Sequence, residues 1–280
     1  MPETIKQLKD YFSKHDDVLM AFVFGSRAAH RERAASDWDI GVYFKTDNWL
    51  ELESTSEYPG ENKIHADLER ILGTEVDMLT LNRARPSLVF TILNAGTPLL
   101  VRDKKLYLEL LSKTHYEAVD FWNFVREFWE IRQKAASLTP EAKALMVEHL
   151  TFLENEFSDL TEFQGMTWKE YREDRSKRRS IERWIENLVM SAMDIAKIVL
   201  ASEKKDVPQT YREALREFGL AYFNEAFASR FCEFAELRNI VAHEYLDMRW
   251  AKIKNFIENA AELYPVFIKG VKNLLEDRKA

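Results

Sequence analysis

The chain has 280 residues, 46% of them hydrophobic and 31% charged, which suffices for one large domain or two of ordinary size. No apolar run approaches the roughly 20 residues of a membrane-spanning helix, and the first residues lack the apolar segment of a secretory signal. A single cysteine, Cys232, excludes an intrachain disulfide and a cysteine-built zinc site. The net charge of −7 argues against a bulk electrostatic attraction to nucleic acid. We therefore expect a cytoplasmic protein that neither spans a membrane nor binds DNA stably.

The first hundred residues alternate short apolar runs with glycine- and proline-containing turns, a pattern typical of mixed strands and helices. The sequence predicts strands over 18–24, 38–44, 75–81 and 97–101. It predicts helices over 3–14, 62–72, 86–95 and 104–137, the third of them beginning at Pro86 and closed by Gly96.

From residue 141 onward glycine and proline are rare, and apolar residues recur at three- and four-residue steps. This spacing predicts four long helices, at about 141–163, 176–203, 209–243 and 248–275. The third is expected to break near Gly219. Short loops between long helices favour an antiparallel bundle, so we predict two domains, 1–138 and 139–280.

Residues 25–39 hold a group of side chains suited to phosphate and metal binding. Gly25 ends a predicted buried strand and lets a phosphate approach the backbone, while Ser26 offers a hydroxyl at a helix start. Asp37 and Asp39 would lie on one face of a strand, and Asp77 is the natural third carboxylate. Such a set suits Mg²⁺ carrying the phosphates of a nucleotide, and Asp77 could also serve as general base. Taken singly, each element is also compatible with an ordinary turn.

The order of these residues resembles the minimal nucleotidyltransferases of the polymerase-beta superfamily, whose pattern is Gly-Ser, ten residues, then Asp-x-Asp. Gly25-Ser26 and Asp37-x-Asp39 fit that pattern without a gap. The resemblance implies a mixed sheet with helices, and transfer of a nucleoside monophosphate from a nucleoside triphosphate with Mg²⁺. His30 departs from the family, which often has glycine there.

A second motif, Arg238-x4-His243, lies near the end of the third helix predicted in the back half. Arginine can hold a scissile phosphate and histidine can move a proton near neutral pH, so together they allow metal-independent cleavage of RNA. On a continuous helix, five residues rotate His243 by roughly 140° away from Arg238. A shared site therefore needs either a helix that ends near residue 242 or a two-fold dimer.

Residues 143–276 resemble HEPN domains in this motif and in two further stretches, 179–196 and 208–211. In HEPN toxins the Arg-x4-His-x-Tyr motif serves as an RNase site, and partner nucleotidyltransferases modify its tyrosine with AMP. Carried over, these residues are Arg238, His243 and Tyr245. In toxin–antitoxin pairs the two domains are usually separate proteins, whereas here they are fused.

The sequence thus predicts an α+β nucleotidyltransferase domain followed by an all-α HEPN four-helix bundle. We expect an enzyme that uses ATP and Mg²⁺ to place AMP on a hydroxyl, in particular a protein tyrosine of a HEPN toxin domain. A small-molecule nucleotidyltransferase of the aminoglycoside-modifying kind is the first alternative, and a non-catalytic nucleotide-binding regulator is the second. A homodimer through the HEPN half and an RNA partner are also expected. The basic run from Arg172 to Arg183 is interpreted as a solvated helix start, with a nucleotide or RNA groove as the alternative.

Overall fold

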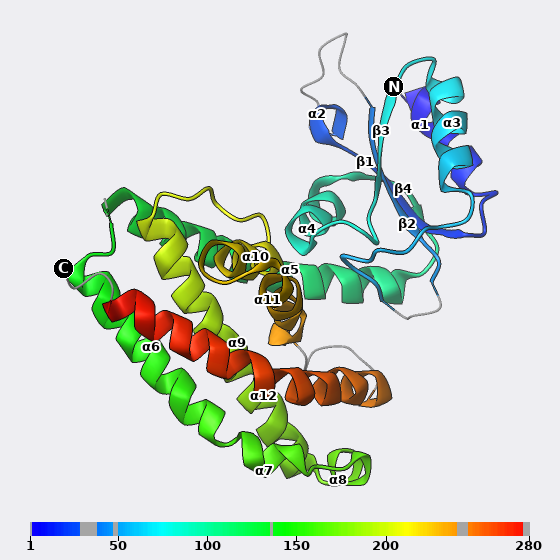
Figure 1. The fold of residues 1–280 in the computed structure, drawn as a ribbon. Coiled ribbons are helices and arrows are strands. Elements are labelled where there is room, and N and C mark those ends of the chain that lie inside the picture. The colour runs from blue at the N-terminus through cyan, green and yellow to red at the C-terminus, as the bar shows by residue number, and fades with distance from the viewer. Residues whose placement is uncertain (1, 29–37, 47–49, 135–136, 240–245, 277–280) are drawn as a thin grey trace. The chain divides into compact units, whose positions relative to one another are not determined.

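The computed structural model describes residues 2–28, 38–46, 50–134, 137–239 and 246–276 (Figure 1). The chain divides into two compact units, Met1–Trp122 and Asn123–Ala280. The domain boundary at residue 138 stays a prediction. Within the described residues, none of the helices combines the length and apolarity that crossing a membrane requires.

The first unit contains a four-stranded sheet in the order β3-β2-β1-β4. β2 pairs with β1 antiparallel and with β3 parallel, and β4 pairs with β1 antiparallel. The strands are β1 (Val18–Phe24), β2 (Trp38–Phe44), β3 (Val76–Thr80) and β4 (Thr97–Val101). The helices are α1 (Pro2–Phe12), α2 (Gly25–Ala28), α3 (Glu61–Leu72), α4 (Pro86–Ala95) and α5 (Lys104–Lys134), the last of which continues into the second unit.

Helices cover both faces of this sheet. Side chains of α1 and α3, including Leu8 and Leu68, pack on one face together with Ile40 and Val42 of β2. Side chains of α4 and the start of α5 pack on the other face together with Tyr43 of β2. Figure 1 shows α1 and α3 on one side of the strands and α4 on the other. The alternation along β2 therefore places Trp38, Ile40, Val42 and Phe44 in the first core and Tyr43 in the second.

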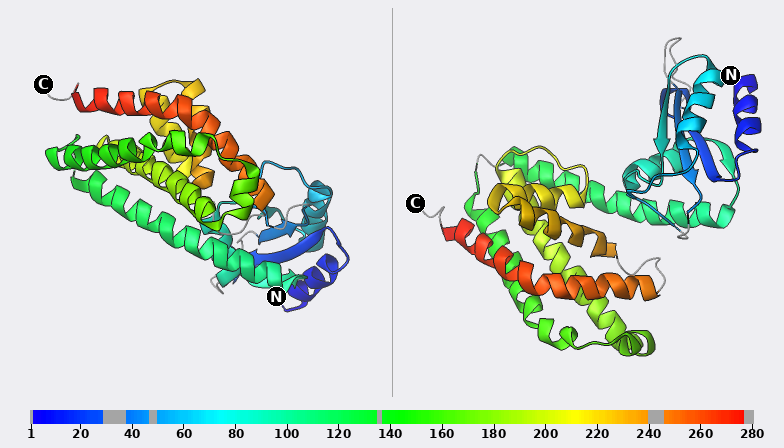
Figure 2. Two further views of the ribbon diagram at one scale, coloured as in Figure 1. Left: turned by 90° about the horizontal axis from the view of Figure 1, so that it is seen from below. Right: turned by 45° about the vertical axis from the view of Figure 1, so that its right-hand side comes forward.

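The second unit is entirely helical where the structure describes it, and the predicted α+β fold class with a helical second half is confirmed. α9 is the central helix, because most of its residues from Ile181 to Ser202 are buried, and α6 contacts both α9 and α12 (Figure 2). The elements are α6 (Pro140–Ser158), α7 (Leu160–Gln164), α8 (Trp168–Glu173), α9 (Arg175–Ser202), α10 (Tyr211–Tyr222), α11 (Glu225–Phe231), the 3₁₀-helix η1 (Cys232–Asn239) and α12 (Leu246–Glu276).

The helix predicted over 209–243 is broken three residues beyond Gly219, near which the break was expected. α10 runs through Gly219, where a Cβ would lie 2.8 Å from the Cα of Ala228, so the glycine allows close packing of α10 against α11. The break comes after Tyr222, because the Asn224 side chain accepts a hydrogen bond from the Phe227 N–H at 2.9 Å and begins a new helix. α11 then ends at Phe231, and the chain continues directly as the 3₁₀-helix η1.

Candidate functional site

Three strand ends meet at one edge of the sheet in the first unit. β1 ends at Phe24 where antiparallel β2 begins, so Phe24 and Asp39 are register partners. β3 runs parallel to β2, and Asp39 and Asp77 are register partners there. The sheet therefore brings two of the three predicted carboxylates to neighbouring positions at the end of β1.

Asp39 and Asp77 also share a face of the sheet. Trp38 and Ile40 pack into the core beneath α1 and α3, so the residue between them projects to the opposite face. Asp77 follows because it is in register with Asp39 on a parallel strand. Asp39 is half-buried and Asp77 is exposed, so the pair faces solvent where a ligand can reach it.

Gly25 lies directly against Asp39 and is required on two grounds. Its φ of +69° lies in the left-handed region that favours glycine, and a Cβ there would overlap the Asp39 carboxylate, 2.8 Å from its Cγ. The Asp39 carboxylate is thus held over the backbone at the start of α2. One turn of this helix separates β1 from the segment 29–37, which lies outside the described residues.

Three of the residues singled out in the sequence at this edge are only partly described, or not described at all. Ser26 belongs to α2, but its side chain is outside the described set, as are Asp37 and His30 entirely. Among the described residues no group of three His, Cys, Asp or Glu side chains could hold a metal ion. Asp39 and Asp77 are a hard oxygen pair of the kind that Mg²⁺ takes, to which the predicted Asp37 would add the third ligand.

Arg238 of the second motif lies in η1 with its guanidinium stacked on an aromatic ring. The guanidinium carbon is 4.1 Å from the centroid of the Tyr211 ring, and Nε donates to the sulfur of Met190 at 2.7 Å. Arg238 is 7% exposed, so this contact is enclosed by the helices around it. Arg238 is therefore held by α9 and α10, while His243 and Tyr245 lie outside the described residues.

A cluster of charges around the buried Lys197 acts on the Tyr211 phenol. Lys197, 8% exposed, bonds with Nζ to a carboxylate oxygen of Glu127 at 2.6 Å and of Asp194 at 2.8 Å. Burial favours the neutral amine, but the two carboxylates outweigh it and raise the pKa of Lys197. Burial, followed by the charges of Asp194 and Glu127, raises the pKa of the Tyr211 phenol well above its ordinary value. Tyr211 consequently stays a neutral ring beneath the guanidinium.

A second buried network fixes the start of α12, which directly follows the motif. Glu182 of α9 accepts a hydrogen bond from the Tyr171 hydroxyl at 2.6 Å and one from Arg249 Nη1 at 2.9 Å. The Glu182 side chain is 4% exposed and that of Arg249 11%. Segment 239–245 is therefore flanked on both sides by residues bound to α9, namely Arg238 through Met190 and Arg249 through Glu182.

Sequence reasoning missed two partners of Arg238, Tyr211 and Met190. Tyr211 stood in a stretch that resembled HEPN domains, but nothing in the sequence showed that its ring would lie under a guanidinium. The sequence did indicate where Tyr211 lies in its helix. Thr210 caps α10 by accepting a hydrogen bond from Glu213 N at 3.0 Å, which fixes Tyr211 at the first helical position. Met190 carried no signal beyond its place on an amphipathic helix.

Comparisons with known proteins give a family match in each half of the chain. Residues 6–105 match the family described as "Polymerase beta, Nucleotidyltransferase", and residues 153–271 match the family described as "Ribonuclease HepT-like". A solved structure described as "Crystal structure of the toxin-antitoxin with AMP-PNP" is 19% identical with a TM-score of 0.32, covering 41% of this chain and 83% of that chain. No curated protein matches significantly.

The chain therefore joins a polymerase-beta-type nucleotidyltransferase domain to a HEPN domain. Both resemblances drawn from the sequence are confirmed at the level of these domains. The individual site residues, the metal, the nucleotide and the acceptor stay predictions.

Proposed function

We propose that the protein transfers AMP from ATP to the hydroxyl of a tyrosine, with Tyr245 of its own HEPN domain, or of a second copy, as the acceptor. The observation that carries the proposal is the placement of Asp39 over Gly25 and beside Asp77 on one face of the sheet. This arrangement combines an acidic metal-binding pair with a backbone that a phosphate can approach.

The carboxylates of Asp37, Asp39 and Asp77 would hold Mg²⁺, which neutralises triphosphate charge and polarises the α-phosphate. Gly25 and Ser26 would position the phosphates at the start of α2. The acceptor oxygen forms a bond to the α-phosphorus while the bond from that phosphorus to the pyrophosphate oxygen breaks. Pyrophosphate leaves with the electron pair, and Asp77 takes the phenol proton.

A tyrosine needs this assistance, because a phenol with a pKa near 10 is a weak nucleophile at neutral pH. Fusion of the two domains supplies the acceptor at high effective concentration, provided that the chain lets Tyr245 or its dimer mate reach the carboxylates. AMP on Tyr245 would add bulk and negative charge two residues from His243. We propose on this basis that modification silences the HEPN motif, as in a toxin–antitoxin system.

Intact mass spectrometry of the purified protein before and after incubation with ATP and Mg²⁺ tests the transfer. We expect a gain of one AMP that peptide mapping places on Tyr245, absent in Tyr245→Phe and present in the control Tyr116→Phe. Tyr116 is a fair control because its side chain is 72% exposed and thus accessible to any non-specific modification.

Two carboxylate variants test the metal site. Asp37→Asn and Asp39→Asn each remove one of the carboxylates that would hold Mg²⁺, and without the metal the triphosphate charge is not offset, so transfer should cease in a folded protein. Wild-type transfer in either variant would overturn the assignment. If the protein gains no mass while an added aminoglycoside is adenylylated, the acceptor is a small molecule. ATP bound without turnover would identify a nucleotide-binding regulator instead.

The HEPN half supports a second activity, the metal-independent cleavage of RNA by Arg238 and His243. The observation that favours it is that Tyr211 and Met190 fix the guanidinium of Arg238, the group that would hold the scissile phosphate. We propose a two-fold dimer through this half. Cleavage should persist in EDTA and vanish in His243→Ala, and light scattering should give twice the mass of one chain. Cleavage that needs Mg²⁺, or a strictly monomeric protein, would contradict this arrangement.

A further inference from the structure

Three arginines form a row along the first half of α9, which we call the arginine stripe: Arg175, Arg179 and Arg183. They are spaced four residues apart, so successive members rise about 6 Å along the helix axis and stay on neighbouring faces. All three are exposed, and the Arg183 side chain retains 69% of its accessible surface. The chain as a whole is acidic, so the stripe is a local cationic feature that net charge conceals.

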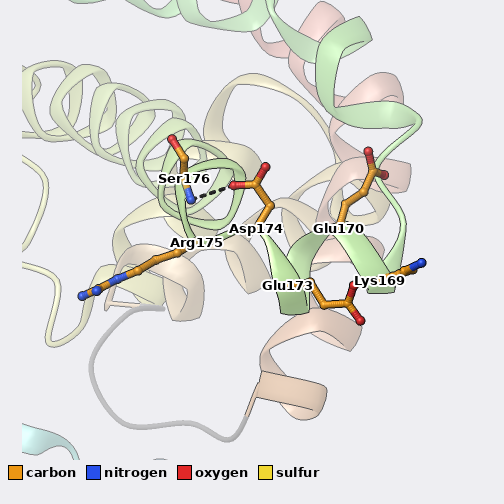
Figure 3. Close-up of a pocket in the computed structure, with 6 residues that line it drawn as sticks. All are labelled: Lys169, Glu170, Glu173, Asp174, Arg175 and Ser176. Carbon is orange, nitrogen blue, oxygen red and sulfur yellow. Dashed lines mark hydrogen bonds between the residues drawn. The ribbon is translucent and has the colours of Figure 1, made fainter.

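Nearby acids leave much of this charge uncompensated. Within the described part of the chain, Arg175 and Arg179 have no ion-pair or hydrogen-bond partner, whereas Arg183 contacts Glu186 at 2.9 Å. Glu182, between the last two arginines, is buried and bound to other groups. Asp174 caps α9 by accepting from the backbone N–H of residues 176 and 177. Arg175 lines the same pocket as Glu170 and Glu173, and Figure 3 shows its side chain extending away from theirs.

The stripe points along α9 toward the second motif. Met190, which contacts Arg238, lies seven residues after Arg183 and eleven after Arg179. These separations place the two arginines within about 20° of Met190 around the axis, at about 10 and 16 Å along it. Arg179, Arg183 and Met190 thus lie along one side of α9, and Met190 in turn contacts Arg238 of η1.

We propose that the arginine stripe binds the phosphate backbone of a single-stranded RNA and guides it toward Arg238. Guanidinium groups recognise phosphate in a bidentate manner, and a row with a repeat close to one nucleotide step suits a flexible strand. The choice of RNA rests on the proposed role of Arg238 and His243, because cleavage without a metal requires the substrate's own 2′-hydroxyl. The stripe itself is outside the motif and takes no part in AMP transfer.

Fluorescence anisotropy with a labelled 20-nucleotide single-stranded RNA at several salt concentrations tests the proposal. The full-length triple variant Arg175→Gln/Arg179→Gln/Arg183→Gln should bind at least tenfold more weakly. The slope of log K against log salt should fall by about 2, since each lost contact to a single strand removes about 0.7. The control Arg216→Gln, which neutralises an exposed arginine of α10 paired with Glu225, should leave affinity unchanged within about twofold.

Three outcomes would overturn the proposal: no RNA binding by the wild type, a triple variant no weaker than the control, or an unchanged salt slope. Displacement of RNA by polyglutamate at equal charge would assign the stripe to an acidic protein partner instead. Helix content and melting temperature of the triple variant verify folding. AMP incorporation is measured in parallel. If the triple variant loses RNA binding but still transfers AMP, the proposed role of the stripe is supported independently of AMP transfer. If the wild-type protein binds RNA through the stripe but transfers no AMP, only the proposed transferase function is refuted.

Discussion

Gly25→Ala is the substitution whose effect the structure specifies most closely. The glycine has φ +69°, and a Cβ at this position would overlap the Asp39 carboxylate. The backbone can accept alanine at a cost of about 1–2 kcal/mol, but the carboxylate must rotate out of its place. We therefore expect the substitution to lower the stability of the fold only slightly but to displace the Asp39 carboxylate from the site.

Gly73→Ala is a matched control. Gly73 has φ +67°, so the backbone cost is the same, yet a Cβ there meets nothing within 4 Å. Both variants should melt roughly 3–8 °C below the wild type. Only Gly25→Ala should lose AMP transfer, by about 100-fold or more, because displacing a reacting group by about 1 Å costs that much.

Differential scanning calorimetry gives the melting temperatures, and the rate of AMP incorporation gives the activity. Mn²⁺ binding provides a readout that does not depend on the acceptor, and it should weaken in Gly25→Ala alone. The reasoning is refuted if Gly25→Ala transfers AMP at the rate of Gly73→Ala, or if the two variants lose activity equally.

Three further predictions concern stability. Glu182→Ala leaves the Arg249 guanidinium buried without its carboxylate and should cost about 3–5 kcal/mol by urea denaturation, with Glu182→Gln costing less. The hydrogen bonds of Arg83 lower the pKa of Glu61, so this pair stabilises the fold above pH 4.5. The melting-temperature difference between wild type and Arg83→Gln should therefore shrink as pH falls below 4.5, and a constant difference would exclude the pairing. Gly219→Ala should destabilise by about 1–3 kcal/mol through overpacking, and an unchanged unfolding midpoint would contradict the close helix contact.

Much of the first unit could be predicted because its elements are specified locally. β1 and β2 lie where apolar runs and alternation placed them, and α4 begins at Pro86 as expected. The helix boundaries of the second unit were harder to predict, because the amphipathic pattern of apolar residues continues across a break between two helices. The spacing of apolar residues does not change at residue 223, where α10 has ended. The N-cap hydrogen bond of Asn224 determines where α11 begins.

The candidate site likewise has a part that the sequence predicts and a part that depends on tertiary packing. The sequence predicts an acid in each of two strands, but that Asp39 and Asp77 are neighbours on one face follows only from the parallel register of β2 and β3. The ring beneath Arg238 could not be predicted, because Tyr211 lies 27 residues earlier in the chain and only tertiary packing brings the two together. Contacts of this kind depend on how helices pack, which a single sequence leaves open.

The two proposals meet at the start of α12, where they make a joint prediction. Arg249 is bound to Glu182, and Glu182 lies between Arg179 and Arg183 on α9. Leu246, the first residue of α12, is three residues before Arg249, about 4.5 Å along the helix, and Tyr245 directly precedes it in the chain.

We predict that the phosphate of AMP on Tyr245 competes with RNA for the arginines of the stripe. RNA should therefore bind the adenylylated protein about tenfold more weakly than the unmodified protein, and the difference should shrink as salt screens the added charge. In Tyr245→Phe, incubation with ATP and Mg²⁺ should leave RNA affinity unchanged. Equal affinity of modified and unmodified protein would show that the modified residue and the stripe act on different surfaces, and would break the link between transfer and RNA binding.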